Sequence, residues 1–153
     1  MIPNGGLISI LVLIPNLLFI VFPPRDIPRT LSKPARGLEL LEWGGRLGIF
    51  VIPFFCWIEM GGAVEMIAVV IMIGALGMYY IGWLRYMRGG RAFALLFQPM
   101  LGLPLPLAIA PIVYFYAASI MLHSWWLLIA TVLLTIGHLY VSNLSWQDTR
   151  VIN

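Results

Sequence analysis

The sequence predicts an all-α, polytopic integral membrane protein folded as a helical bundle. Of its residues, 61% are hydrophobic and only 10% are charged, which is far from the composition of soluble domains. Several apolar runs are also long enough to cross a bilayer. A chain of 153 residues has room for five spans of about 20 residues each and for little else. We therefore expect 1–153 to form a single transmembrane domain.

Prolines and short polar segments divide the chain into five predicted spans. Pro15 interrupts the first apolar run, Pro23 ends it, and Pro53 predicts a kink in the second. Between the third and fourth spans, prolines break an apolar stretch that is longer than one span, so we expect a short interfacial or re-entrant segment near 91–100. The predicted transmembrane helices cover about 6–22, 37–57, 63–84, 103–122 and 125–141, and a polar tail follows them.

The basic residues give this topology an orientation. Four lie between 24 and 36, three between 85 and 91, and one at Arg150, whereas the other two connections have none. Cytoplasmic loops collect Lys and Arg, so we expect the N-terminus outside and the C-terminus in the cytoplasm. The predicted location is the cell (cytoplasmic) membrane, with the lipid bilayer as a partner and no nucleic acid.

The second predicted span carries Glu39, Glu42 and Arg46 on one side of its helix. Charges within a span face protein or water rather than lipid. Glu42 and Arg46 are four residues apart in the order that favours an ion pair. Glycines, which allow helices to approach closely, lie on the opposite side: Gly37, Gly44 and Gly48. We therefore expect this helix at the centre of the bundle.

Polar residues from four predicted spans reach a similar depth in the cytoplasmic half. His138 lies about 6 Å from the cytoplasmic end of the fifth span, close in depth to Glu42 and Arg46. We expect a site for a small anionic or amphipathic ligand, with Arg46 as its charge partner and His138 as the group that titrates near neutral pH. The predicted ligand-binding residues are Arg46, Glu42, His138, Asn16, Thr135, Tyr79, Tyr80 and Glu39.

The sequence leaves three classes of function open. The favoured one is binding or transport of a small-molecule or lipid ligand by a homo-oligomer, or together with a partner membrane subunit. The second is a membrane enzyme that acts on a lipid or apolar substrate at the cytoplasmic leaflet, with His138 or Glu42 as acid or base. The third is a non-catalytic structural subunit of a membrane complex.

Sequence motifs do not narrow these three classes further. The chain has no G-x-S-x-G, H-E-x-x-H, Walker or C-x-x-C motif, and it has one cysteine, Cys56. We expect no metal site, and the sequence indicates no particular cofactor. Ligand binding is favoured over catalysis because a membrane enzyme usually needs more ionisable groups than this chain carries.

Overall fold

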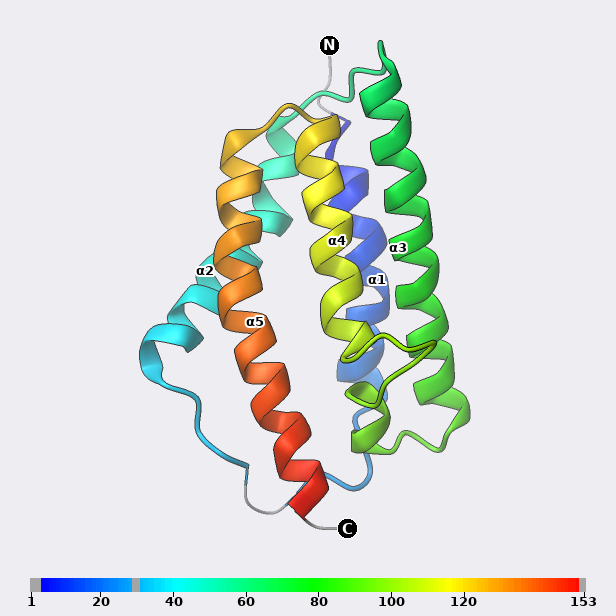
Figure 1. The fold of residues 1–153 in the computed structure, drawn as a ribbon, viewed down its shortest axis with the longest axis vertical. Coiled ribbons are helices and arrows are strands. Elements are labelled where there is room, and N and C mark those ends of the chain that lie inside the picture. The colour runs from blue at the N-terminus through cyan, green and yellow to red at the C-terminus, as the bar shows by residue number, and fades with distance from the viewer. Residues whose placement is uncertain (1–3, 29–30, 152–153) are drawn as a thin grey trace.

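The structure, a computed structural model, describes residues 4–28 and 31–151, which form a bundle of five α-helices (Figure 1). Successive α-helices run in opposite directions along the bundle. No β-strand occurs among the described residues, which confirms the all-α class. The helices are α1 (Gly6–Val21), α2 (Arg36–Val51), α3 (Ala63–Arg88), α4 (Pro106–Met121) and α5 (Trp125–Val151), with two short 3-10 helices, η1 (Ile52–Phe55) and η2 (Phe93–Leu96).

Length separates the apolar helices into two groups. Both α3 and α5 contain an 18-residue window of high mean hydropathy, 2.0 in α3 and 1.7 in α5, and both helices are long and apolar enough to cross a membrane. The apolar helices α1 and α4 have 16 residues each. That length is about 24 Å, against a hydrocarbon core of about 30 Å. Two helices therefore have the length and composition of membrane spans, and the five-span topology stays a prediction.

Two helices differ in length from the expectation. α5 does not stop before a polar tail but continues through 142–151, where no glycine or proline ends it. Asp148 on this extension accepts hydrogen bonds from the backbone nitrogen and the hydroxyl of Ser32, at 2.8 and 2.7 Å. α2 ends at Val51, because Pro53 in η1 cannot donate the next backbone hydrogen bond of an α-helix.

The expected central position of the second span is wrong, because α4 fills the centre of the bundle. Eleven of the sixteen residues of α4 are buried, among them Tyr114 and Phe115. α2 buries only a narrow stripe of Glu42, Gly45 and Ile49 and leaves its other side open. The helix of the second predicted span is therefore peripheral and packs on α5.

Glycines allow the backbones of α2 and α5 to touch. A Cβ atom at Gly45 would lie 2.6 Å from the Cα of Leu134, and one at Gly137 would lie 2.7 Å from the Cα of Glu42. Both distances are far inside van der Waals contact, so no larger residue fits without moving a helix. The crossing brings Glu42 directly against the C-terminal half of α5.

Only one of the three glycines that were expected to mark a helix contact does so. A Cβ at Gly48 would lie 2.5 Å from the Cβ of Ala130 on α5. At Gly37 and Gly44 no atom lies within 4 Å of the same position. The contact side of α2 is thus the side that carries Glu42, not the side opposite the charges.

The two longer loops and the end of α5 meet at the lower end of the bundle in Figure 1. Loop 22–35 is joined to the segment after α3 by the hydrogen bonds Arg25 N to Arg91 O, at 3.2 Å, and Phe93 N to Asp26 Oδ1, at 2.6 Å. Arg29 lies outside the described residues. The described basic residues other than Arg46 all belong to this end: Arg25, Lys33, Arg36, Arg85, Arg88, Arg91 and Arg150.

The segment near 91–100 is a loop held against α3. It contains η2, in which Leu96 is buried. The guanidinium of Arg85 donates to the carbonyl oxygens of Leu95, Gln98 and Pro99, at 2.8, 2.7 and 3.0 Å. These three hydrogen bonds fix the loop across the lower end of the bundle, where Leu96 contributes to the cavity described next.

Candidate functional site

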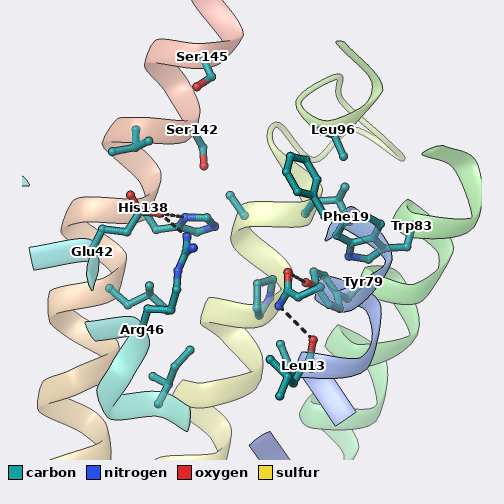
Figure 2. Close-up of a pocket in the computed structure, with 18 of the residues that line it drawn as sticks. Leu13, Phe19, Glu42, Arg46, Tyr79, Trp83, Leu96, His138, Ser142 and Ser145 are labelled. Atoms are coloured by element: carbon teal, nitrogen blue, oxygen red, sulfur yellow. Dashed lines mark hydrogen bonds and ion pairs between the residues drawn. The ribbon is translucent and has the colours of Figure 1, made fainter. Parts of the chain in front are cut away.

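A cavity of about 540 Å³ lies in the half of the bundle that is lower in Figure 1 and upper in Figure 2, between the pair α2–α5 on one side and α1, α3 and α4 on the other. All five α-helices and η2 contribute side chains to its lining. The volume falls in the range of about 300–1,000 Å³ that is typical of pockets for small organic ligands.

One wall of the cavity is polar and is built by α2 and α5. Glu42 is 8% exposed, and its Oε1 contacts both Arg46 Nη2, at 2.6 Å, and His138 Nδ1, at 2.7 Å. Arg46 lies one turn after Glu42 on α2, whereas His138 reaches the same oxygen from α5 because the two helices touch at their glycines. Ser142 and Ser145 extend this wall along α5, as Figure 2 shows.

The contact with Glu42 sets the chemistry of the His138 imidazole. An ionised carboxylate only accepts hydrogen bonds, so we assign a proton to Nδ1 of His138. Nε2 is then a proton acceptor when the ring is neutral and a donor when it is charged. Among the described residues, neither Nε2 of His138 nor Nη1 or Nε of Arg46 has a hydrogen-bond partner. The wall therefore offers guanidinium donors and one imidazole nitrogen to a ligand.

The facing wall is mostly apolar, includes aromatic side chains from α1 and α3, and contains one amide. The Tyr79 hydroxyl donates to Asn16 Oδ1 at 2.9 Å, and Asn16 Nδ2 donates to the Val12 carbonyl at 3.1 Å. Phe19 and Trp83 lie one turn further along α1 and α3 (Figure 2). The indole N–H of Trp83 is buried and meets no acceptor in hydrogen-bond geometry in the described part of the chain, although the Tyr79 hydroxyl is a neighbour. This wall thus combines apolar area with one unused donor.

Five of the eight predicted site residues line this single cavity: Glu42, Arg46, His138, Asn16 and Tyr79. The other three lie elsewhere. The Thr135 hydroxyl donates to the Thr131 carbonyl at 2.7 Å and lies 3.2 Å from the Tyr116 hydroxyl. Tyr80 donates to the Leu11 carbonyl at 2.9 Å. The side chain of Glu39 is exposed on α2.

Several lining residues were missed by the sequence analysis. Phe19 lies three residues after Asn16, and Trp83 lies four residues after Tyr79, so helical spacing could have placed them on the same faces. Ser145 lies seven residues after His138 but was assigned to a tail. Leu96 comes from a loop, for which helical spacing gives no signal.

The opposite end of the bundle has one comparable polar contact. His123 Nε2 lies 3.1 Å from Glu65 Oε1, and Glu65 Oε2 is buried without a partner among the described residues. Among all the residues that the structure describes, no three His, Cys, Asp or Glu side chains lie close enough together to bind a metal ion. The polar groups that share a cavity are those of the lower half.

Fold and site together define a helical bundle with a partly open cavity that is charged on one side and apolar on the other. Comparison of the chain with protein-family models, curated proteins and solved structures finds no match. The chemistry of the cavity is therefore the basis for a functional proposal.

Proposed function

We propose that this chain is an integral membrane protein that binds a small anionic or amphipathic ligand in the cavity between α2–α5 and α1–α3–α4. One observation carries the proposal. Arg46 and His138, on different helices, line the same cavity, and both have hydrogen-bonding atoms that no described residue uses. Arg46 and His138 are partly exposed to this cavity, so their unused hydrogen-bonding atoms must be met there by a ligand or by water.

The proposal includes five spans in the cell membrane, with the N-terminus outside and the C-terminus in the cytoplasm. Large apolar side chains are exposed on every α-helix, which suits contact with lipid better than with water. The basic residues at the lower end would be cytoplasmic. Exposed tryptophans toward the other end suit the outer interface: Trp57, Trp125 and Trp126. The 16-residue helices would span the bilayer only if it thins locally, or if the side chains of flanking residues extend to the membrane interface.

Transport is the finer form of this proposal. The cavity lies in the lower half, and above it the bundle is closed by the buried hydrogen bonds Ser9 Oγ to Ile49 O, at 2.8 Å, and Tyr114 OH to Ile8 O, at 3.0 Å. A transported ligand would therefore require α1 to separate from α2 and α4 at these contacts.

The proposal also includes assembly with a second copy or with a partner membrane subunit. The outward side of α2 exposes apolar residues and a glycine against which nothing packs: Leu40, Trp43, Leu47 and Gly44. In a Cys56→Ala background, Gly44→Cys should form a disulfide-linked dimer in membranes, whereas an exposed cysteine at Ile73 on α3 should not. Equal cross-linking at both positions would contradict assembly through α2.

A membrane enzyme is the second candidate, and the contact between Glu42 and His138 favours it. A carboxylate bound to one imidazole nitrogen orients the ring and supports the other nitrogen as a general base. The cavity offers no nucleophile in hydrogen-bond contact with Nε2, which is why ligand binding remains our first proposal.

The proposal is tested by the molecules that purify with the protein. Ser145 lines the cavity, so Ser145→Trp should fill part of it, whereas Asn143→Trp places the same side chain on an exposed position of the same helix. Mass spectrometry should find a bound small molecule in the parent and in Asn143→Trp but not in Ser145→Trp. If Ser145→Trp retained the same molecules, the cavity would not be the binding site, and a structural subunit would be the better interpretation.

A further inference from the structure

We infer that the ligand is a single-chain amphiphile with an anionic head group, and that it reaches the cavity sideways from the membrane past α1. This inference rests on the proposed function and specifies its ligand. It follows from the contrast between the two walls, from the unused hydrogen-bonding atoms, and from the composition of the rim.

The contrast between the walls distinguishes an amphiphile from a free ion or a plain hydrocarbon. The charged side chains of the cavity all lie on the α2–α5 wall. There, Arg46 and His138 contact the same carboxylate oxygen of Glu42. The opposite wall presents Phe19 and Trp83. A free ion would leave the aromatic wall without a partner, and a hydrocarbon would leave the charged groups unsolvated. A molecule with one polar end and one apolar part satisfies both walls.

The unused atoms of the polar wall favour an anionic head. Glu42 Oε1 accepts from Arg46 Nη2 and contacts His138 Nδ1, which leaves the remaining guanidinium N–H groups, Nε2 and the acceptor Oε2 of Glu42 for the ligand. Guanidinium binds carboxylate or phosphate oxygens through charge-assisted hydrogen bonds. Nε2 can donate to an anion when His138 is protonated, or accept the proton of an acid when it is neutral, so the head group and imidazole share one proton.

The rim and the size of the cavity favour one chain and lateral access. Leu13, Phe19 and Ile20 of α1 line the cavity and are also exposed on the outside of the bundle, Ile20 by 75%. An apolar rim of this kind lets a hydrocarbon chain pass without meeting water. A volume of about 540 Å³ is in the range of pockets for one small organic ligand, which suits one chain with its head group.

Native mass spectrometry of the purified full chain in a non-ionic detergent tests the inference with defined probes. The probes are hexadecanoate and lysophosphatidate, which have a chain and an anionic head; hexadecanol, which has a neutral head; and acetate and inorganic phosphate, which have no chain. Hexadecanoate or lysophosphatidate should bind one molecule per chain, and hexadecanol, acetate and phosphate should not displace it. The affinities of these two amphiphiles show whether the site prefers a carboxylate or a phosphate head group.

Two variant pairs locate the head and the access route. Arg46→Gln should weaken binding of the anionic amphiphile by about tenfold or more, the value of a hydrogen bond to a charged group. Arg46→Lys should restore part of this loss, and the exposed control Arg88→Gln should change nothing. Ile20→Trp should slow binding because it narrows the rim, whereas Ile73→Trp, on the outer side of α3, should not.

The outcomes separate this inference from the proposed function. If acetate, phosphate or hexadecanol bound as well as hexadecanoate and lost the same affinity in Arg46→Gln, the amphiphile assignment would be overturned and the cavity would remain a ligand site. If no probe distinguished Arg46→Gln from Arg88→Gln, both proposals would be overturned. Equal association rates for Ile20→Trp and Ile73→Trp would overturn lateral access past α1.

Discussion

Glu42 is the residue on which the polar wall depends. It is nearly buried, and one of its oxygens contacts two side chains, of which Arg46 is 43% exposed and His138 is half-buried. A guanidinium stays charged at any physiological pH and therefore needs an acceptor or water. Loss of Glu42 would therefore leave two side chains without their acceptor, whereas loss of Arg46 would leave Glu42 with His138.

Removing Glu42 should destabilise the protein more than removing Arg46. Glu42→Ala leaves a charged guanidinium and an imidazole without their acceptor and should cost about 3 kcal/mol. Arg46→Ala should cost about 1 kcal/mol, because Glu42 keeps its contact with His138 and the Glu42–Arg46 ion pair is partly exposed to solvent. Unfolding of both variants in one detergent measures the difference, and a larger loss for Arg46→Ala would contradict the assigned roles.

At the residue scale the sequence predicted the ion pair of Glu42 and Arg46, which the structure confirms, but it did not predict which other polar groups share their cavity. Glu42, Arg46 and His138 were placed at one level by counting residues along predicted helices, and they line one cavity. Thr135 was placed there by the same counting, yet its hydroxyl bonds a carbonyl of its own helix. Periodicity cannot separate these cases because a short hydroxyl side chain is satisfied locally wherever it points.

Among the elements, the crossing of α2 and α5 has the largest effect on the site, since it sets the distance between Glu42 and His138. The sequence contained the glycines of this crossing but did not reveal which of them face α5. A helical wheel of α2 places glycines on more than one side. Only the packing of the helices shows that Gly45, and not its neighbour Gly44, contacts α5. The sequence predicts a polar tail where α5 continues, because polarity alone does not distinguish a tail from an exposed helix, and none of these residues breaks a helix.

Adjacent glycines of α2 therefore provide a matched test. Gly45→Ala places a Cβ against the backbone of α5 and should destabilise the protein by about 2 kcal/mol, as overpacking does. Gly44→Ala meets no atom within 4 Å and should be neutral or stabilise the helix by up to about 1 kcal/mol. Thermal unfolding in detergent compares them, and equal effects would mean that the helices do not cross at Gly45.

The loop after α3 should depend on Arg85. Arg85→Gln removes donors to three loop carbonyls and should cost about 2 kcal/mol, with faster hydrogen exchange at the amides of Leu95, Phe97 and Gln98. Arg88→Gln, an exposed arginine of the same helix end, should leave this exchange unchanged. Unaltered exchange in Arg85→Gln would show that the loop is held by its apolar contacts alone.

At the scale of the whole molecule, the clustering of basic residues at one end supports the proposed orientation in the membrane. Single cysteines at Gly62 and Ser124, in a Cys56→Ala background, should react with an impermeant thiol reagent added to intact cells. Cysteines at Ser32 and Gly89 should react only after the membrane is opened, because both loops lie at the basic end. Labelling of Ser32→Cys or Gly89→Cys in intact cells, without labelling of Gly62→Cys, would reverse the orientation.

The composition of the chain predicted an all-helical fold, which the structure confirms, because fold class follows from many residues acting together. The membrane environment stays a prediction, supported by the length and hydropathy of α3 and α5. The position of α4 at the centre could not be predicted in this way, since its sequence is apolar on all sides and gives no direction. The cavity likewise arises from the divergence of α1 from α2 below their contact at Ser9 and Ile49. No local pattern in the sequence records that divergence.

An experimental structure determined with ω-bromohexadecanoate tests the ligand site most directly, because bromine marks the end of the chain. We predict the carboxylate at about 3 Å from Arg46 and from Nε2 of His138, with the bromine beside Phe19 or Trp83. Bromine found only on the outer surface of the helices, with the polar wall closed by protein side chains, would contradict the account.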